Sequence, residues 1–236
     1  MKISIITASY NSERDIAGLI NSLEALDDDN FEWVVADGGS VDASLEMIGQ
    51  AHLARVTVLS GPDFGIYDAL NKAVRAATGV YYLVLGADDV IYPDALRNFR
   101  RALATQASDF VAAAVVGGAT VLKPGQGSYW RRGGNAYVAS HAVGTLIRTA
   151  LHDECGFYKN RYPNCADMYF ILFCLRKKNK TINYAPFVAG AFGVAGISSV
   201  ERSTSVTDAF RIARDLGAGF WGPAAVLAYR LLRFCR

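Results

Sequence analysis

The chain has 236 residues, of which 52% are apolar and 19% are charged, and its formal net charge is +2. This length suits one large α/β domain, or one domain with a small appendage, and the apolar fraction can supply a sizeable core. A charge so close to zero argues against a dedicated nucleic-acid binder, which normally carries a strong basic stripe, so we expect no nucleic-acid partner.

The cysteines and the start of the chain bear on its location. The four cysteines form no C-x-x-C pair and match no metal or disulfide spacing, which predicts reduced thiols in a cytoplasmic protein. The chain opens on a strand-like run at 2–6 without a secretory leader, and no stretch approaches the roughly 20 apolar residues that a membrane span needs. We therefore expect a cytoplasmic chain that does not cross a bilayer.

Strand and helix patterns alternate from residue 2 to about residue 105. Strands are predicted at 2–7, 31–36, 55–59 and 80–85, and helices from Asn11 or Ser12 to about 25, after Asp42, at 67–77 and from Pro93 to about 104. This alternation predicts a parallel sheet with helices on both faces. Ligands of such sheets bind at the carboxyl ends of the strands. The loops at those ends, 8–11, 37–42, 60–65 and 86–89, are rich in polar residues.

The second half of the chain has a less regular pattern. Two short strands around a bend at 117–118 are predicted within 110–122, followed by a loop at 129–134 and a strand at 142–147. A long apolar face predicts a buried helix at 166–177, and a strand at 181–188 leads into a glycine-rich, uncharged stretch that ends near 199. No repeat or low-complexity linker divides the chain, so we predict one domain over 1–205.

Carboxylates follow two of the predicted strands. Asp88 and Asp89 come after the apolar strand at 80–85 and form a candidate metal site, because hard divalent cations bridge a few carboxylates to substrate phosphates. The alternative is a solvated turn or a cap for the next helix. Asp37 follows the second strand, where it either forms an Asx-turn or accepts hydrogen bonds from a nucleotide base on which Tyr10 would stack.

The predicted helix at 67–77 has a polar face. Asp68, Asn71, Lys72 and Arg75 recur at helical spacing, opposite a face of apolar residues. This face is either an ordinary solvated one with an Asp68–Lys72 ion pair, or it places the side chain of Lys72 or Arg75 near a diphosphate.

Two residues of the second half are further candidates. Asp167 stands before the apolar run of the helix at 166–177, where it either caps the helix or acts as a base poised over the sheet. His141 precedes an apolar strand and, taken alone, is more often structural than catalytic.

The order of these segments is more specific than any one of them. The matching segments are 4–11, 34–42, 61–72, 85–89, 140–141, 166–169 and 195–198, of which the stretch from Asp63 to Lys72 (DFGIYDALNK) is the most specific. Over about residues 2–200 the chain resembles the inverting family 2 of the GT-A glycosyltransferases. It is most similar to bacterial enzymes that build exopolysaccharide, O-antigen and colanic-acid repeat units.

The resemblance implies a fold and a set of site residues. The fold is α/β of the GT-A type, with a mostly parallel nucleotide-binding sheet and helices on both faces at 1–105, and a mixed acceptor-side half at 106–205. The residues implied to bind the nucleotide-sugar donor are Ser9, Tyr10, Asp37, Asp68, Asn71, Lys72 and Asp88. Among them Asp37 would bind the nucleobase, Tyr10 would stack on it, and Asp88 would reach the ribose or the sugar. Asp89 would bind the divalent cofactor, Mg²⁺ or Mn²⁺.

The resemblance also implies the acceptor side. Asp167 resembles the base that deprotonates the acceptor hydroxyl; the family often has Glu-Asp there, and this chain has Ala166-Asp167. His141 resembles a histidine that is often followed by Gln, here by Ala142, and is a candidate acceptor-site residue. The donor is expected to be a UDP-sugar, and the acceptor a saccharide or a polyprenyl-linked saccharide.

The residue types suit an inverting displacement at an anomeric carbon. A carboxylate within hydrogen-bond reach supplies the base, and a divalent cation neutralises charge that develops on the diphosphate. Two alternatives stay open. A nucleotidyltransferase would normally have a glycine-rich, basic loop after its first strand, and this chain has Ala-Ser-Tyr-Asn at 8–11. A catalytically inactive sugar-nucleotide or glycan-binding protein would not need Asp88, Asp89 and Asp167 together.

The segment 206–236 is predicted to be a separate helical appendage. From Arg211 to the end it has five arginines and one acid, Asp215, mixed with aromatic and aliphatic residues. Such a segment can lie in a membrane interface, which would hold the protein at the inner face of the cytoplasmic membrane. The alternative is a helix that packs on the catalytic domain or on a partner subunit.

Overall fold

The structure is a computed structural model of the chain, and it describes residues 1–125, 136–139, 141–193 and 202–234. At 202–203 and 230–234 the description covers the backbone alone. The loop predicted at 129–134, the motif at 195–198, Ser140 and Cys235 lie outside the described residues.

One sheet runs through the molecule, with its strands in the order β3-β2-β1-β4-β8-β6-β9-β5 and with β7 paired to β6. The described strands are β1 (Ile3–Ser9), β2 (Phe31–Asp37), β3 (Val56–Ser60), β4 (Tyr81–Val84), β5 (Val90–Ile91), β6 (Phe110–Gly117), β7 (Thr120–Leu122), β8 (Thr145–Arg148) and β9 (Ile182–Phe192). The strands β1 to β4 are parallel to one another, whereas β8 is antiparallel to both β4 and β6. The predicted parallel half and mixed half are therefore both present.

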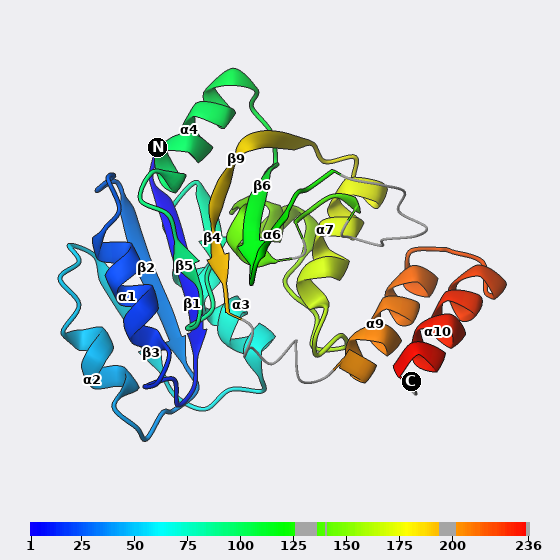
Figure 1. Cartoon of the computed structure of the whole chain (residues 1–236), viewed down its shortest axis with the longest axis horizontal. Helices are drawn as coiled ribbons and strands as arrows, with labels where there is room; N and C mark the ends of the chain where they lie inside the picture. The colour runs from blue at the N-terminus through cyan, green and yellow to red at the C-terminus, as the bar shows by residue number, and fades with distance from the viewer. Residues whose placement is uncertain (126–135, 140, 194–201, 235–236) are drawn as a thin grey trace.

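Helices cover both faces of this sheet (Figure 1). The described helices are α1 (Ile16–Glu24), α2 (Ser44–Gly49), α3 (Ile66–Ala76), α4 (Ala95–Thr105), the 3-10 helix η2 (Ala142–Gly144), α6 (Leu151–Cys155), α7 (Ala166–Lys177), α9 (Arg202–Asp215) and α10 (Trp221–Phe234). Side chains alternate across a strand, so Ile5 of β1 joins a core with α1 and α4, while Ile6 joins a second core with α3 and α7. Burial on both faces explains why β1 and β2 are nearly continuous apolar runs.

Most predicted elements agree with the observed ones, and the exceptions have local causes. Helix α1 begins at Ile16 and not at Asn11 or Ser12, because Asn11 has a left-handed φ of 46° and its side chain accepts a hydrogen bond from the Val41 N–H. The strand predicted at 142–147 begins with η2, and the β-structure is limited to β8. β5 and α6 were not predicted, since elements this short leave no periodicity to detect.

The C-terminal helices α9 and α10 lie side by side at one end of the molecule (Figure 1). α9 packs on the core shared by α3 and α7 through Ile212 and Leu216, which are buried. α10 packs on α9, and most of its described side chains are exposed or half-buried. In the described part of the chain, no helix is long and apolar enough to span a membrane. The division into 1–205 and 206–236 stays a prediction.

Candidate active site

The predicted donor residues lie at the carboxyl ends of neighbouring parallel strands. β1 ends at Ser9, which is paired in register with Asp37 at the end of β2, and β4 lies on the other side of β1. Their three loops therefore meet at one edge of the sheet, which is where ligands of such sheets bind. Ser9 is buried, whereas the ring of Tyr10, in the loop after β1, is 64% exposed and open to a stacking partner.

Asp37 is buried, and both of its carboxylate oxygens accept hydrogen bonds. Oδ2 accepts from the N–H groups of Gly39 and Ser40 at 3.0 Å and from the Ser60 hydroxyl at 2.8 Å, and Oδ1 accepts from the Ser40 hydroxyl at 2.5 Å. Burial acts to raise the pKa of Asp37, but these hydrogen bonds outweigh it and lower the pKa. A carboxylate has about four lone-pair sites. Three of the four bonds end on Oδ2, so Oδ1, which accepts one, keeps a position at which it could accept another hydrogen bond.

The polar face predicted for the helix at 67–77 is split in the structure. Lys72 and Asp68 form an i,i+4 ion pair at 3.2 Å, and the Lys72 ammonium also donates to the Pro62 carbonyl at 2.9 Å. Asn71, expected on the same face, is buried. Its amide donates to the Tyr158 carbonyl at 2.9 Å and accepts from the Tyr158 N–H at 3.0 Å. In this arrangement Asn71 joins α3 to the chain before α7, and its amide has no free edge toward a ligand.

Asp88 and Asp89 follow β4, and their carboxylates lie over the backbone of Gly86. A β-carbon on Gly86 would be 3.1 Å from Asp88 Oδ1 and 3.2 Å from Asp89 Oδ2. The Asp89 side chain is fully buried and accepts one hydrogen bond from the Gly86 N–H at 2.6 Å. Burial raises the pKa of Asp89 to about 7, and the charge of Asp88 adds to the effect, while N–H groups of Gly86 and Gly193 act in the opposite direction.

Three polar atoms in this region are buried and have no hydrogen-bond partner among the residues that the structure describes. They are Asp88 Oδ2, Asp89 Oδ1 and His141 Nδ1. His141 Nδ1 lies 3.8 Å from Asp89 Oδ2, and its imidazole stacks on Phe192 at 4.4 Å between ring centroids. Burial lowers the pKa of His141 to about 4, against the opposing charge of Asp167, so its imidazole is neutral at pH 7. Unpaired buried oxygens and a neutral imidazole nitrogen are the groups that a cation would satisfy.

These residues fit a divalent cation only in part. Within the described ranges, no three His, Cys, Asp or Glu side chains lie close enough together to hold a metal ion by themselves. Mg²⁺-type sites in phosphate chemistry commonly take one or two carboxylates and complete their shell with substrate phosphates and water. The unpaired carboxylate oxygens fit a site of that kind, which a bound diphosphate would complete.

The predicted base, Asp167, lies in the first turn of α7 and is half-buried. Its Oδ1 accepts a hydrogen bond of 2.6 Å from the hydroxyl of Tyr67, which lies in the first turn of α3. Asp167 is also close enough to His141 for its charge to act on that imidazole. The structure therefore brings α3, α7, His141 and the acidic loop after β4 close to one another.

Two residues of this site were not among the predicted ones. Tyr67 lies within the specific stretch 63–72, but its hydrogen-bond partner, Asp167, is 100 positions away in the sequence. Gly193 follows β9, where a β-carbon would be 2.0 Å from Asp88 Oδ2, so the backbone packs directly on that carboxylate. The glycine-rich composition of 188–199 was the one signal for it.

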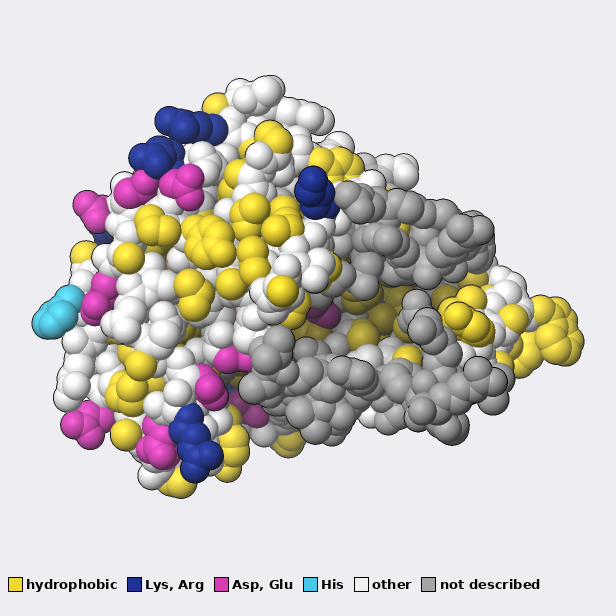
Figure 2. Space-filling view, in the orientation of Figure 1, with side chains coloured by type: hydrophobic (Ala, Val, Ile, Leu, Met, Phe, Trp, Pro, Cys, Tyr) yellow, Lys and Arg dark blue, Asp and Glu magenta, His cyan; other side chains and the backbone are white. Residues whose placement is uncertain are grey.

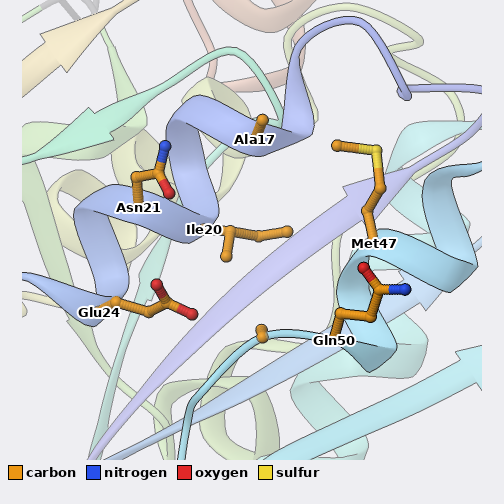
Figure 3. Close-up of a pocket in the computed structure, with 7 residues that line it drawn as sticks. Ala17, Ile20, Asn21, Glu24, Met47 and Gln50 are labelled. Atoms are coloured by element: carbon orange, nitrogen blue, oxygen red, sulfur yellow. The ribbon is translucent and has the colours of Figure 1, made fainter.

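A shallow groove on another part of the surface contains none of these residues. It lies between α1 and α2 (Figure 3) and is lined by Ala17, Ile20, Asn21, Glu24, Met47, Gln50 and Ala51. It has no cluster of titratable side chains, and we assign it no function.

The fold is that of the GT-A glycosyltransferases. The chain matches residues 1–349 of Staphylococcus aureus TarS in complex with UDP-GlcNAc with a TM-score of 0.68 at 22% identity, over 98% of this chain and 72% of that one. It matches the mannosyltransferase PcManGT of *Pyrobaculum calidifontis*, in complex with GDP-Man and Mn²⁺, with a TM-score of 0.70 at 19% identity, over 96% and 68% of the two chains.

The sequence comparison gives the family. The model of glycosyl transferase family 2 matches residues 4–159, and the chain belongs to this family. A PGL/p-HBAD biosynthesis glycosyltransferase of *Mycobacterium tuberculosis* is 28% identical over 204 residues, which cover 82% of this chain and 77% of the relative. The matched residues include Asp37, Asp88, Asp89 and His141, whereas Asp167 lies beyond them.

Proposed function

We propose that this glycosyltransferase moves a sugar from a UDP-sugar to a saccharide hydroxyl, with inversion and with the help of a divalent cation. The observation that carries the proposal is the set of buried, unpaired atoms of Asp88, Asp89 and His141 beside the half-buried carboxylate of Asp167. Groups of this kind are costly to bury unless a ligand satisfies them.

The nucleotide would bind across the loops that follow β1 and β2. The exposed ring of Tyr10 would stack on the base, and Oδ1 of Asp37, which accepts one hydrogen bond in the structure, would accept a second one from the base. Among similar solved structures, TarS and a mycobacterial glucosyl-3-phosphoglycerate synthase contain UDP or a UDP-sugar, whereas PcManGT contains GDP-Man. We propose UDP as the donor nucleotide because the first two of these structures contain it.

Lys72 and Asp68 would act near the diphosphate. The Lys72 ammonium is half-exposed, and its present partners are Asp68 and the Pro62 carbonyl. An exposed ion pair of this kind contributes little to stability, so the lysine can turn toward a phosphate at small cost. We assign Asn71 a structural part, because both ends of its amide bind the backbone of Tyr158.

A divalent cation, Mg²⁺ or Mn²⁺, would be held by Asp89, with Asp88 and His141 as further ligands or as neighbours of the sugar. When bound, it would neutralise the charge that develops on the departing diphosphate. Both PcManGT and the mycobacterial synthase have Mn²⁺ in their structures. The role for His141 differs from the acceptor role predicted from the sequence, and it follows from the 3.8 Å approach of Nδ1 to Asp89.

Asp167 would act as the base. Its carboxylate would take the proton from the acceptor hydroxyl while the hydroxyl oxygen forms a bond to the anomeric carbon. The bond from that carbon to the diphosphate oxygen breaks on the opposite face, and UDP leaves with the electron pair. One displacement inverts the configuration. One carboxylate base suffices here, whereas a glycosidase needs two carboxyl groups that flank a single bond.

The acceptor would be a saccharide, either free or linked to a polyprenyl lipid. A lipid-linked acceptor would bring the enzyme to the inner face of the cytoplasmic membrane. The catalytically inactive binding protein and the nucleotidyltransferase have no observation of their own in their favour.

A donor screen tests the proposal. Purified full-length protein is incubated with UDP-sugars and GDP-sugars, with Mn²⁺, with Mg²⁺ or with excess chelator, and release of the nucleotide is measured. We expect release from a UDP-sugar that depends on the cation and is stimulated by a saccharide acceptor. Full activity in excess chelator would contradict the cation site, and binding of a donor without turnover under any condition would favour the inactive binding protein.

A further inference from the structure

α10 is apolar but exposed, which is unusual for a helix of this composition. From Gly217 to Tyr229 the chain has no charged residue, yet Trp221 is 82% exposed and Phe220 is 51% exposed. Val226 and Tyr229, farther along the helix, are also exposed. A helix that is apolar all round is normally buried, so this surface lacks the cover that its composition calls for.

Among the described residues, the α9–α10 hairpin (202–234) has its polar contacts with the domain on α9. Asp215 accepts hydrogen bonds from Tyr162 and forms an ion pair with Arg161 at 3.2 Å, and the fully buried Asp208 accepts from the Asn164 N–H at 3.1 Å. The predicted alternatives for the C-terminal segment are therefore divided between its two helices. α9 packs on the catalytic domain, and α10 is left for an external surface.

Basic side chains border the exposed aromatic residues. The guanidinium of Arg214 lies 5.8 Å from the centre of the Phe220 ring, and the Lys177 ammonium is the nearest group to Gly217 in the turn between the helices. Both acids of the described hairpin, Asp208 and Asp215, already bind partners in the domain. Figure 2 shows hydrophobic side chains at the right-hand edge of the molecule. In the same orientation, Figure 1 shows the turn between α9 and α10 at that edge.

We propose that the exposed face of α10 and the α9–α10 turn dock on an anionic lipid surface. Phe220 and Trp221 enter the head-group region, where aromatic rings are favoured, and Arg214 and Lys177 lie against the negative head groups. The charges favour this occupant over a second copy of the chain, because two such faces would bring like charges together. The docking is independent of the proposed catalytic residues.

Flotation with vesicles tests this surface. Full-length protein is mixed with phosphatidylglycerol-rich vesicles or with phosphatidylcholine vesicles at low and high salt. We expect flotation with the anionic vesicles alone, weakened by salt. Trp221→Glu should lower the bound fraction about tenfold or more, because it replaces a large apolar side chain by a charge. Val41→Glu is the matched control, since Val41 is an equally exposed apolar residue in the loop before α2.

Three outcomes would overturn the proposal. The wild type would fail to float with anionic vesicles, or Trp221→Glu would lower the melting temperature far more than Val41→Glu, which would mean that the side chain is packed. Analytical ultracentrifugation could also show a dimer that Trp221→Glu dissociates, in which case a second copy covers this face.

A second inference rests on the hydrogen bond between Tyr67 and Asp167 and on the proposed function of Asp167. The Tyr67 side chain is buried, and burial together with the charge of Asp167 raises its pKa well above the ordinary value, so the hydroxyl keeps its proton and donates. Its ring lies 5.6 Å from that of Tyr158, which Asn71 binds to α3. The phenol is thus fixed by packing before it meets the carboxylate.

The geometry points to Tyr67 as the positioning residue for the base. Its bond occupies Oδ1, and no described residue donates a hydrogen bond to Oδ2 of Asp167. A carboxylate with one oxygen held and the other open can accept a proton from a hydroxyl that approaches from one direction. A tyrosine in the most specific donor-side stretch thereby sets the orientation of the acceptor-side base.

A double-mutant cycle tests this role. Tyr67→Phe removes the hydroxyl and keeps the ring, and it should lower kcat about tenfold to a hundredfold with an unchanged affinity for UDP. In an Asp167→Asn background the same substitution should have no further effect on kcat. Tyr158→Phe is the control, because its hydroxyl binds that of Tyr82 and not the carboxylate.

The positioning role of Tyr67 and the base role of Asp167 would be contradicted by different results. If Tyr67→Phe lowers kcat by the same factor with and without Asp167, the tyrosine does not act through the base, and this inference is wrong. If Asp167→Asn by itself keeps wild-type turnover, the base assignment is wrong, and the positioning role is overturned with it.

Discussion

Two acidic loops follow neighbouring parts of the same sheet, and their carboxylates are in opposite states. Asp37, after β2, accepts four hydrogen bonds and has a lowered pKa. Asp89, after β4, is fully buried with one oxygen unpaired and has a pKa raised to about 7. Buried polar groups are normally satisfied. The hydrogen-bond partners of Asp37 thus come from the protein itself, whereas in the proposed function a ligand supplies the missing partner of Asp89.

We expect this difference to separate carboxylates whose main effect is on stability from carboxylates whose main effect is on turnover. Substitution of a satisfied carboxylate should reduce stability, because its donors are then left buried without a partner. Substitution of an unsatisfied one should reduce turnover and leave stability unchanged or higher. The following predictions test that division.

The largest effect is expected at Asp167. Asp167→Asn keeps the shape of the side chain and removes its basicity, so turnover should fall by about two to four orders of magnitude. UDP binding, measured by calorimetry, should be unchanged. If the variant instead loses affinity for the donor and keeps its turnover, the residue belongs to the donor site and not to the acceptor side.

A smaller loss of turnover is expected from Gly193→Ala. The added β-carbon would lie 2.0 Å from Asp88 Oδ2, so that carboxylate must move. Misplacement by about 1 Å can cost about a hundredfold in rate, which sets the upper end of the expected loss. Gly18→Ala is the control, because nothing lies within 4 Å of its β-carbon. Equal activity of both variants would show that Asp88 has no fixed position in the reaction.

Asp37→Ala should affect both binding and stability. Removal of its carboxylate leaves the N–H groups of Gly39 and Ser40 without their acceptor, so the free energy of unfolding should fall by about 1 to 3 kcal/mol. Affinity for UDP should fall about tenfold if Asp37 also contacts the base. Ser60→Ala, which removes one donor to the same carboxylate, should change stability alone. Equal UDP affinity of Asp37→Ala and wild type would leave Asp37 a purely structural role.

The smallest effect is expected at Glu32, a satisfied acid far from the site. Burial acts to raise its pKa, but hydrogen bonds from Lys2, Ser4 and Thr78 lower it to about 2. The folded pKa is below the unfolded one, so its stabilisation is present above about pH 4.5 and is lost as the pH falls toward 2.

Urea titrations from pH 7 to pH 2 would measure this contribution. The difference in free energy of unfolding between wild type and Glu32→Gln should shrink as the pH falls, whereas the exposed Glu46→Gln should show no difference at any pH. A Glu32→Gln difference that is constant with pH would mean that the ion pair with Lys2 does not perturb the carboxylate in the folded state.

The sequence predicts local periodicity well and long-range pairing poorly. α7 was predicted at 166–177 and is observed at Ala166–Lys177, because its apolar run is long and unbroken. The polar face of α3 was predicted as one surface, but Asn71 is buried against the backbone of Tyr158, 87 positions away. The pattern within a helix contains no information about such a partner.

The same limit applies to the site. The acids Asp88, Asp89 and Asp167 were predicted as separate candidates, each with a structural alternative. The proximity of Asp89 and Asp167 to His141 depends on how β8 pairs with β4 and on how α7 packs on the sheet. The sequence pattern does not reveal such pairing. The sequence also could not predict whether α10 is exposed, since an apolar helix can equally well pack on a domain.

The binding of Mn²⁺ with UDP tests the central claim most directly. Calorimetric titration of UDP into the full-length protein should show tighter binding with Mn²⁺ than with chelator. Mn²⁺ with UDP should also raise the melting temperature of the wild type by mass action. Asp89→Asn should fold, bind UDP as the wild type does in chelator, and gain nothing from Mn²⁺. An equal gain from Mn²⁺ in wild type and Asp89→Asn would contradict the account, because the cation would then bind without the unpaired carboxylate of Asp89.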